Sequence, residues 1–477
     1  MRHPFRVQST LNGPPVDEIE LPLNSRHTIY PLLFSLQEIY KHHLHLTHKL
    51  CEDVSQGKNL KKGAPGMSGW QILVLIVIRC QGNYSFDDME IMFNNDRLIR
   101  QFLELDYYDE ATTFHTDTLQ QTFKKVRTET LQVISDAFLN LAMKDMGEDG
   151  KTVRSDSFVC QTSTHYPTDQ SLLYDALRVI LREFKKSIGP KLGWRQAEHL
   201  TRQAKKFSKD VSDLKKGKSK KCKASTKTRK VRQAYNRLIN LSALVMQKGI
   251  DTAESEEWTM LDQSRRDQLE DYLDRLDMII TQTFNRVVLE EKVKVSDKLY
   301  SFFETHATLI NRGKFPQPFE IGRRVVVSEG KTGLILDARV MDRCEVDAQE
   351  TIPLLKRLSE KYGKLSCLSV DRGYRSKDLE NTFGDYAEEI VIPQWGRTPK
   401  GTEETLDHRE KRWWRSGVES LISALQRKNG LKRCPDKGLE AMRLWVAGGV
   451  FSRNLITYGR YLMKKKLKEE ETVPIAA

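Results

Sequence analysis

The chain has 477 residues, enough for about three domains at roughly 150 residues each. Its net charge is +13, and 39% of its residues are apolar, enough to form hydrophobic cores. The longest apolar run, residues 72–78, is shorter than the ~18 residues of a membrane-spanning helix, and residues 1–10 lack the apolar core of a secretory signal. Seven scattered cysteines without a Cys-x-x-Cys pair exclude a disulfide framework and a zinc ribbon. We therefore expect a cytoplasmic protein with reduced cysteines, whose positive charge favours a polyanionic partner.

Residues 27–145 carry apolar side chains at three- and four-residue spacing, which predicts helices. Ser85 with the acidic residues that follow it is typical of a helix start. We expect an all-helical N-terminal domain over residues 1–150. Breaks near residues 82–83 and 94–96 are compatible with a DNA-binding helix-turn-helix or with a purely structural cap.

Polar and apolar residues alternate along residues 151–162, and several side chains there are β-branched, which predicts a strand. Residues 151–170 would form the first part of an α/β core. Helical patterns without a strand signal then continue to about residue 310, so residues 171–312 are predicted to be a large helical insertion.

Within this insertion, residues 202–232 hold 14 Lys and Arg against two Asp, a net charge of +12. Such a basic arm can neutralise DNA phosphates, and the alternative is a solvated, lysine-rich loop. The shortage of large apolar residues predicts that the arm is mobile when unbound. The predicted DNA contacts of the arm are Lys215, Lys216, Lys220 and Lys221.

The rest of the core, residues 313–450, alternates strands and helices. We predict a hairpin from strands 324–328 and 333–341, helices 348–362 and 376–383, strands 365–370 and 389–393, and helices 414–427 and 439–462. Residues 451–477 would finish the last helix and form a charged tail. The fold class is α/β with a mixed sheet, preceded by the helical N-terminal domain.

Three acidic residues stand where such a sheet would gather them. Asp156 lies in the first strand, Asp371 directly follows strand 365–370, and Glu419 lies on a late helix. Grouped carboxylates favour Mg²⁺ or Mn²⁺, and two such ions can hold both oxygens of a phosphoryl transfer. Each aspartate taken singly is also compatible with capping a turn.

Basic and aromatic residues surround these acids. Arg372, Tyr374 and Arg375 follow Asp371, a combination suited to phosphate contact and base stacking. Arg415 precedes Glu419 by one helical turn, so both side chains share a helix face. Arg427 and Lys428 continue this positive track, and we expect these residues to contact DNA.

Several segments resemble DDE transposases of bacterial insertion sequences. The acidic motifs are residues 153–157 (Val-Arg-Ser-Asp-Ser), 370–374 (Val-Asp-Arg-Gly-Tyr) and 415–425 (Arg-Ser-Gly-Val-Glu-Ser-Leu-Ile-Ser-Ala-Leu). Residues 165–175 resemble more narrowly the group catalogued as ISNCY. Residues 68–74 and 85–90 are similar to the helical lead domain of the family. The resemblance covers roughly residues 65 to 450.

This resemblance implies an RNase H-like catalytic core, interrupted by the helical insertion. It further implies Mg²⁺-dependent cleavage at transposon ends and joining of the freed 3′-hydroxyl to target DNA, with Asp156, Asp371 and Glu419 as metal ligands. The implied partners are double-stranded DNA, with terminal inverted repeats and target, and a second copy in a synaptic complex. A tyrosine and a lysine of the related signature are replaced here by Arg412 and Gln426.

Two other functions stay open: a catalytically silent DNA-binding repressor or architectural protein, and an endonuclease that does not join strands. Adjacent histidines at 42 and 43 argue against zinc binding by the cluster His42, His43, His45 and His48. Ser155 and Ser157 lack the elbow motif of a serine nucleophile, and the chain lacks an ATP-binding P-loop. Trp413 and Trp414 are compatible with base stacking or with helix packing.

Overall fold

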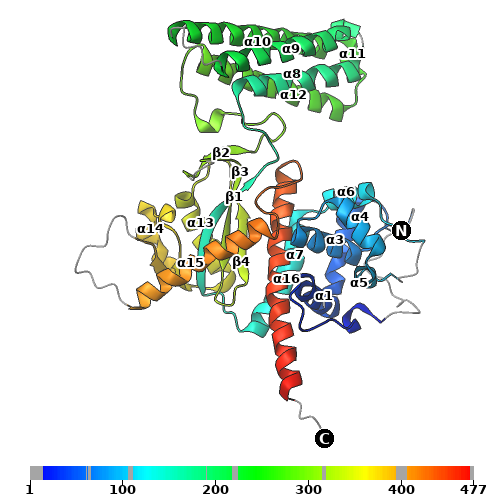
Figure 1. Ribbon diagram of the computed structural model, residues 1–477, viewed down its shortest axis with the longest axis vertical. Coiled ribbons are helices and arrows are strands. Elements are labelled where there is room, and N and C mark those ends of the chain that lie inside the picture. Colours follow the sequence, from blue (N-terminus) through cyan, green and yellow to red (C-terminus); the bar gives the residue numbers. More distant parts are fainter. Residues whose placement is uncertain are drawn as a thin grey trace, which may run out of the picture. The chain divides into compact units, whose positions relative to one another are not determined.

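The computed structural model describes residues 14–60, 62, 66–105, 111–189, 191–216, 224–313, 318–393 and 406–472 (Figure 1). The chain divides into two compact units. The first comprises Met1–Ser163 and Arg323–Ala477, and the second is Thr164–Gly322. The second unit therefore interrupts the first, at a position close to that of the predicted insertion.

The strands form a mixed sheet of six members. They are β1 (Thr152–Gln161), β2 (Thr308–Asn311), β3 (Phe319–Glu329), β4 (Ile335–Val340), β5 (Leu365–Ser369) and β6 (Ala387–Val391). The path runs β2-β3-β1-β5-β6, and β4 also pairs with β3. β1 is parallel to β5 and β5 to β6, whereas β3 and β4 form an antiparallel hairpin. The predicted α/β class with a mixed sheet is confirmed.

β2 was not expected, because the predicted insertion contains no strand signal. Its four residues pair antiparallel with the first residues of β3, from Thr308 opposite Gly322 to Asn311 opposite Phe319. Both paired segments lie in the second unit. A four-residue strand is too short for its alternation to stand out from neighbouring sequence.

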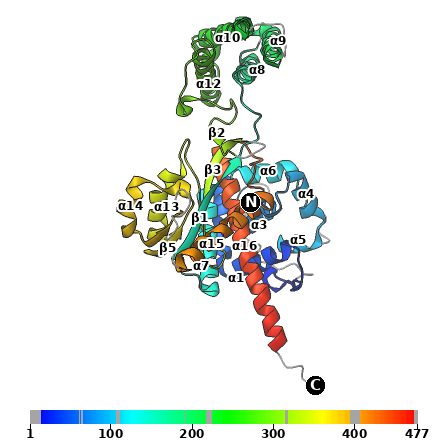
Figure 2. The ribbon, with the colours of Figure 1, turned by 60° about the vertical axis from the view of Figure 1, so that its left-hand side comes forward.

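Helices cover both faces of the sheet in the first unit. They are α13 (Asp347–Tyr362), the short η5 (Arg372–Tyr374), α14 (Lys377–Thr382), η6 (Phe383–Asp385), α15 (Leu406–Arg427) and α16 (Leu439–Thr472). Figure 2 shows α13 and α14 on one side of β1 and α16 on the other. α15 begins eight residues before its predicted start, and α16 continues through the predicted charged tail to Thr472.

The N-terminal part contributes further helices to the same unit. They are η1 (Val16–Glu18), α1 (Ile29–His43), η2 (Leu44–Thr47), α2 (His48–Ser55), α3 (Gly69–Gly82), α4 (Phe86–Asn95), α5 (Arg97–Phe102), α6 (Thr116–Lys124) and α7 (Thr128–Met146). α1, α3 and α7 pack on α16, and one hydrophobic core joins Leu33 of α1, Val326 of β3 and Leu455 of α16. These helices therefore share a core with the sheet instead of forming a compact unit of their own over 1–150.

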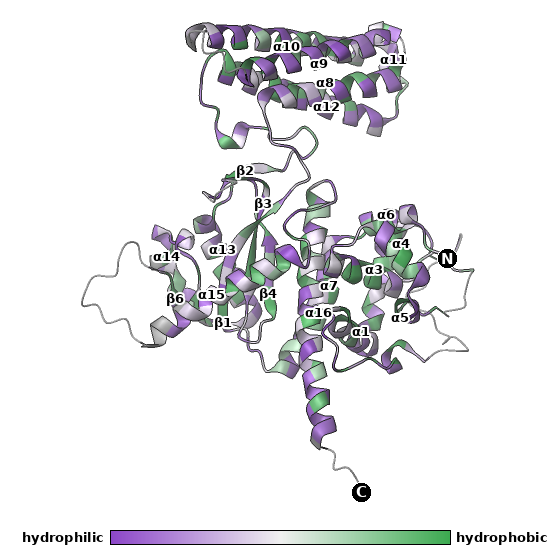
Figure 3. Ribbon diagram, in the orientation of Figure 1, coloured by the Kyte–Doolittle hydropathy of each residue, from purple (hydrophilic) through white to green (hydrophobic). Residues whose placement is uncertain are grey.

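The helices on either side of the break at residues 82–83, α3 and α4, have surfaces that do not favour entry into a DNA groove. The apolar residues of α3 are all buried, and this helix is largely hydrophobic in Figure 3. Ser85 caps α4 in a reciprocal hydrogen-bonding pair with Asp88, as its sequence predicts. Asp87 and Asp88 are exposed, so α4 presents negative charge, which DNA phosphates repel.

The second unit is a helical bundle with its own hydrophobic core. Its elements are α8 (Asp169–Ile188), η3 (Lys191–Gln196), α9 (Ala197–Lys216), α10 (Ala224–Ala253), α11 (Glu256–Thr259), α12 (Gln263–Val287) and η4 (Val295–Asp297). Trp194 stacks on Phe184 inside this core, with ring centroids 4.6 Å apart.

The expectation of a mobile basic arm is wrong for the described part of residues 202–232. Residues 202–216 belong to α9 and residues 224–232 to α10, and only 217–223 lie outside the described residues. Ala204 and Val211 on α9 and Ala234 on α10 are buried. A few small or medium apolar residues at helical spacing thus fix these helices although their exposed faces are lysine-rich.

In the described part of the chain, no helix combines the length and apolar character that crossing a membrane requires. The six cysteines found there are all free thiols, as predicted. Cys222 lies outside the described residues.

Candidate active site

Asp156 lies in the middle of β1, the strand between β3 and β5. Its Oδ1 accepts a hydrogen bond of 2.7 Å from the backbone N–H of Ser157. Burial raises the pKa of Asp156 to about 6, the Ser157 N–H opposes this rise, and the Asp371 and Asp347 carboxylates add to it. A nearby cation would therefore stabilise the ionised form of Asp156.

Asp371 follows the end of β5, the strand parallel to β1, and it precedes η5. Its side chain is 51% exposed, and its Oδ1 lies 3.8 Å from Nη1 of Arg415 on α15. Arg415 also lowers the pKa of Asp156, so one guanidinium faces both aspartates. The structure therefore brings Asp156, Asp371 and Arg415 together, as the sequence predicts for the two aspartates.

A cavity of about 510 Å³ adjoins Asp371. It is lined by Asp371, Arg372, Pro393, Trp413 and Arg415. A slightly larger cavity, of about 570 Å³, lies between α7, β4 and α16 and contains none of the predicted site residues. We take the first cavity as the candidate site because its lining places one acid, Asp371, beside two arginines, Arg372 and Arg415.

Arg154 anchors α15 to the sheet beside Asp156. Residues two apart on a strand share a face, so Arg154 and Asp156 both point toward α15. Arg154 lies 2.7 Å from the buried carboxylate of Glu329, and it donates to the backbone oxygen of Trp414. A Cβ at Gly417 would lie 2.1 Å from Arg154 Nη1. Glycine in the third acidic motif therefore permits the close approach of helix and strand.

Glu419 lies on α15 as predicted, and its side chain is exposed. Within the described residues, no three His, Cys, Asp or Glu side chains are grouped so that they could hold a metal ion. The donor chemistry fits a hard divalent cation in part, since the buried Asp156 and nearby Asp371 supply carboxylate oxygens. The third predicted ligand is not grouped with them in this conformation.

The prediction that Tyr374 contacts DNA is contradicted by its burial. Tyr374 is 0% exposed, and burial, together with the Asp347 and Asp156 carboxylates, raises its pKa well above the usual range. Its aromatic ring belongs to the hydrophobic core beneath the η5 turn. The same motif exposes the side chains of Arg372 and Arg375.

The other predicted DNA contacts are distributed over both units. Arg427 and Lys428 are exposed at the end of α15. Lys215 and Lys216 are both exposed at the end of α9, and the Nζ of Lys215 donates to the hydroxyl of Tyr235 at 2.5 Å. Lys220 and Lys221 lie outside the described residues. Lys215 is thus engaged by Tyr235 of the bundle, although its side chain is partly open to solvent.

The two tryptophans have different surroundings. Trp413 is 60% exposed at the cavity, whereas the Trp414 ring lies 4.9 Å from the guanidinium of Arg154. Trp414 therefore packs between helix and strand. The hydroxyl groups of Ser155 and Ser157 are hydrogen-bonded to Ser328 and to Asp347, respectively, and not to a histidine that could activate a nucleophile.

Sequence patterns missed Asp347, the first residue of α13. Its carboxylate accepts a hydrogen bond from Ser157 Oγ at 2.7 Å and lies 2.9 Å from Arg324 Nη1. The only signal was an acidic residue at the start of a predicted helix, which ordinarily reflects the helix dipole.

Comparisons with protein-family models, with curated proteins and with solved structures find no match to this chain.

Proposed function

We propose that this protein is a DDE transposase, which cleaves DNA at transposon ends and joins the freed 3′-hydroxyl to target DNA. The observation that carries the proposal is the closeness of Asp156 and Asp371, from adjacent parallel strands, with Arg415 beside them. The resemblance of all three acidic motifs to this family supports the same conclusion. The substrate would be double-stranded DNA, held by two copies of the chain.

The sheet would be an RNase H-like core. In support, β1 lies in the interior of the sheet. On one side of it is the antiparallel hairpin of β3 and β4, and on the other are the parallel strands β5 and β6. The second unit enters the chain after β1 and ends within β3, at Gly322, so the strands from Arg323 onward and β1 belong to the first unit.

Asp156, Asp371 and Glu419 would hold Mg²⁺ or Mn²⁺, two ions per site. Bound divalent cations would neutralise charge on the transferred phosphate and activate the attacking oxygen. For Glu419 to take part, its exposed side chain on α15 must come to the two aspartates when DNA and metal bind. Movement of α15 would also release Arg415 from Asp371.

The basic residues of the chain would position the DNA. Arg372 and Arg415 lie at the cavity beside Asp371, where they can bind the phosphates flanking the scissile bond. Lys205, Lys206 and Lys209 are exposed on α9 and would neutralise phosphates further away. Affinity that depends on such contacts should fall steeply as salt rises.

A catalytically silent DNA-binding protein is the second candidate. The exposure of Glu419 and the contact of Arg415 with Asp371 favour it, because a protein without metal chemistry would retain such an arrangement. An endonuclease that cuts without joining would use the same carboxylates as a transposase.

A product assay separates these functions. The full chain is incubated with Mg²⁺, target DNA and DNA from both flanks of its gene, where the proposal expects inverted repeats. We expect cleavage at the repeat ends and, in addition, strand-transfer products of the size of repeat DNA joined to target. Cleavage without joined products would identify a nuclease, and binding without cleavage would contradict the proposal of an enzyme.

A further inference from the structure

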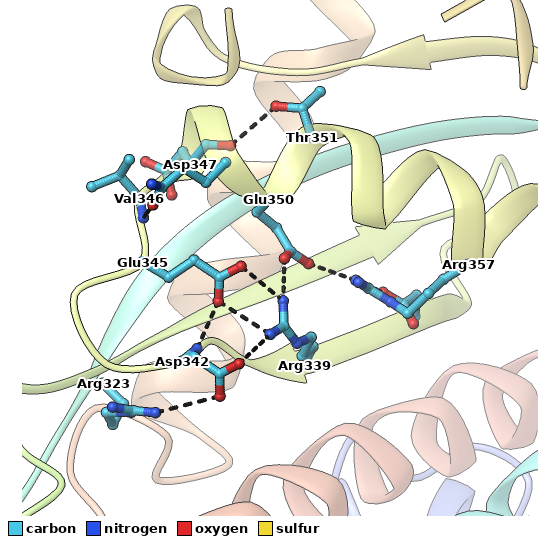
Figure 4. Close-up of polar contacts among 11 residues, drawn as sticks. Arg323, Arg339, Asp342, Glu345, Val346, Asp347, Glu350, Thr351 and Arg357 are labelled. Carbon is cyan, nitrogen blue, oxygen red and sulfur yellow. Dashed lines mark hydrogen bonds and ion pairs between the residues drawn. The ribbon is translucent and has the colours of Figure 1, made fainter. Parts of the chain in front are cut away.

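The N-terminal turn of α13 contacts both segments that carry the candidate metal ligands, β1 beside Asp156 and the turn after Asp371. Asp347 begins this helix and receives the Ser157 hydroxyl from β1 at 2.7 Å. Thr351 Oγ1, one turn later, lies 3.0 Å from the backbone oxygen of Asp347 and 2.7 Å from that of Tyr374 in the turn after Asp371. The first of these Thr351 contacts is drawn in Figure 4.

Asp347 approaches β1 from the side opposite to Asp156. Neighbouring residues of a strand point to opposite faces, so the Ser157 side chain leaves β1 away from the Asp156 side chain. The same Ser157 donates its backbone N–H to Asp156 Oδ1 at 2.7 Å. Fixing the Ser157 side chain through Asp347 therefore also fixes the N–H that orients Asp156.

Both oxygens of Asp347 are already engaged. Oδ1 accepts from Ser157, and Oδ2 lies 2.9 Å from Arg324 Nη1 on β3. A Cβ at Gly373 would lie 3.4 Å from Oδ2, so the turn after Asp371 passes directly against this carboxylate. Asp347 is thus placed to orient its neighbours and is not free to bind a metal itself.

An ion-pair network holds this turn of α13 in place. Figure 4 shows Glu350, one turn into the helix, between Arg339 and Arg357. The Glu350 side chain is fully buried, and Arg357 also binds Asp337 of β4 at 2.9 Å. The helix start is therefore tied to the sheet independently of Asp347, which makes it a fixed support for that residue.

We infer that Asp347 is a positioning residue for a divalent-cation site formed by Asp156 and Asp371. It acts through Ser157 on Asp156 and through the Gly373 turn on Asp371. This inference rests on the proposed function, since it assumes that these two aspartates bind the cation. Partners that orient metal ligands typically contribute 10- to 100-fold in metal affinity or activity.

The test is to titrate the full chain with Mn²⁺ and to measure the heat of binding by calorimetry. Melting temperatures are measured in parallel. We expect Asp347→Ala to weaken Mn²⁺ binding about 10- to 100-fold while the chain stays folded. Asp347→Asn, which keeps an oxygen for the Ser157 hydroxyl, should recover part of the affinity. The matched control is Glu360→Ala, which removes an exposed acid near the other end of α13 and should bind Mn²⁺ like the wild type.

In the cleavage assay, Asp347→Ala should lower kcat and leave KM for DNA unchanged, because Asp347 does not line the cavity beside Asp371. If Asp347→Ala does not fold, Ser157→Ala, which removes one hydroxyl, should weaken Mn²⁺ binding in the same direction. Wild-type Mn²⁺ affinity in the folded Asp347→Ala and Ser157→Ala variants would overturn the inference.

The failure of the proposed function gives a different result. If Asp371→Asn binds Mn²⁺ as tightly as the wild type, the aspartate pair is not the cation site, and both proposals fall. If Asp371→Asn loses binding while Asp347→Ala retains it, only the positioning role of Asp347 is wrong.

Discussion

Replacing Asp371 by Asn is expected to reduce Mg²⁺-dependent DNA cleavage by more than about 100-fold, since even indirect partners of metal ligands contribute roughly 10- to 100-fold. The substitution is nearly isosteric, and the side chain is 51% exposed, so folding should be preserved. Loss of the charge removes one of the two neighbouring carboxylates that would bind the cation. Cleavage rates at saturating Mg²⁺, measured with equal amounts of folded protein, give the comparison.

The matched control is Asp378→Asn, which removes an exposed carboxylate from α14 a few residues later. This variant should cleave at the wild-type rate, because its charge lies outside the aspartate pair. Equal cleavage by wild type and Asp371→Asn would show that Asp371 has no part in the chemistry.

The largest effect on stability is expected at Arg79, a charged residue within the buried helix α3. Its side chain is 2% exposed and lies 2.9 Å from Asp436, which is 7% exposed. The guanidinium carbon also lies 4.0 Å from the ring centroid of Phe86 and 4.8 Å from that of Trp445. Arg79→Ala leaves the Asp436 charge buried without this partner and should reduce the free energy of unfolding by about 3–5 kcal/mol.

Urea unfolding followed by circular dichroism measures this loss. Arg460→Ala, which removes an exposed arginine from α16, should change the free energy of unfolding by less than about 0.5 kcal/mol. The double variant Arg79→Met with Asp436→Leu should recover most of the stability, because an apolar pair removes both charges together. A loss below about 1 kcal/mol in Arg79→Ala would contradict the buried ion pair.

The sheet was predictable because its strands have strong local signals. β1, β3 and β4 contain short runs of β-branched residues, and the turn over residues 330–334 joins β3 to β4. Asp156 was expected within one strand and Asp371 just after another, and the parallel pairing of β1 with β5, with Arg154 opposite Ser369, brings these two segments level with each other. Local pattern and sheet geometry agree at these positions.

The boundaries of the long helices were less predictable. Residues 464–471 of α16 are almost all Lys and Glu, a composition that we interpreted as a charged tail. Lys and Glu are also strong helix formers, so these residues extend the existing helix. The lysines of α9 likewise concealed an amphipathic helix, because its buried stripe includes only small and medium side chains such as Ala204 and Val211.

The surroundings of the candidate site depend on contacts between distant segments. Tyr374 was predicted to stack on a base, since composition alone does not reveal that its ring enters the core. Asp347 and Ser157 are 190 residues apart in sequence, and Arg154 and Trp414 are 260 apart. Such pairings arise from tertiary packing and leave no periodic signal in the chain.

The most direct test of the central claim is to locate Mn²⁺ in crystals of the full chain bound to its repeat DNA. Anomalous diffraction should place Mn²⁺ against the carboxylates of Asp156 and Asp371, with Glu419 moved in to complete the site. Anomalous signal elsewhere, or DNA bound with Arg415 still on Asp371 and no Mn²⁺ beside it, would contradict metal-dependent catalysis by these residues.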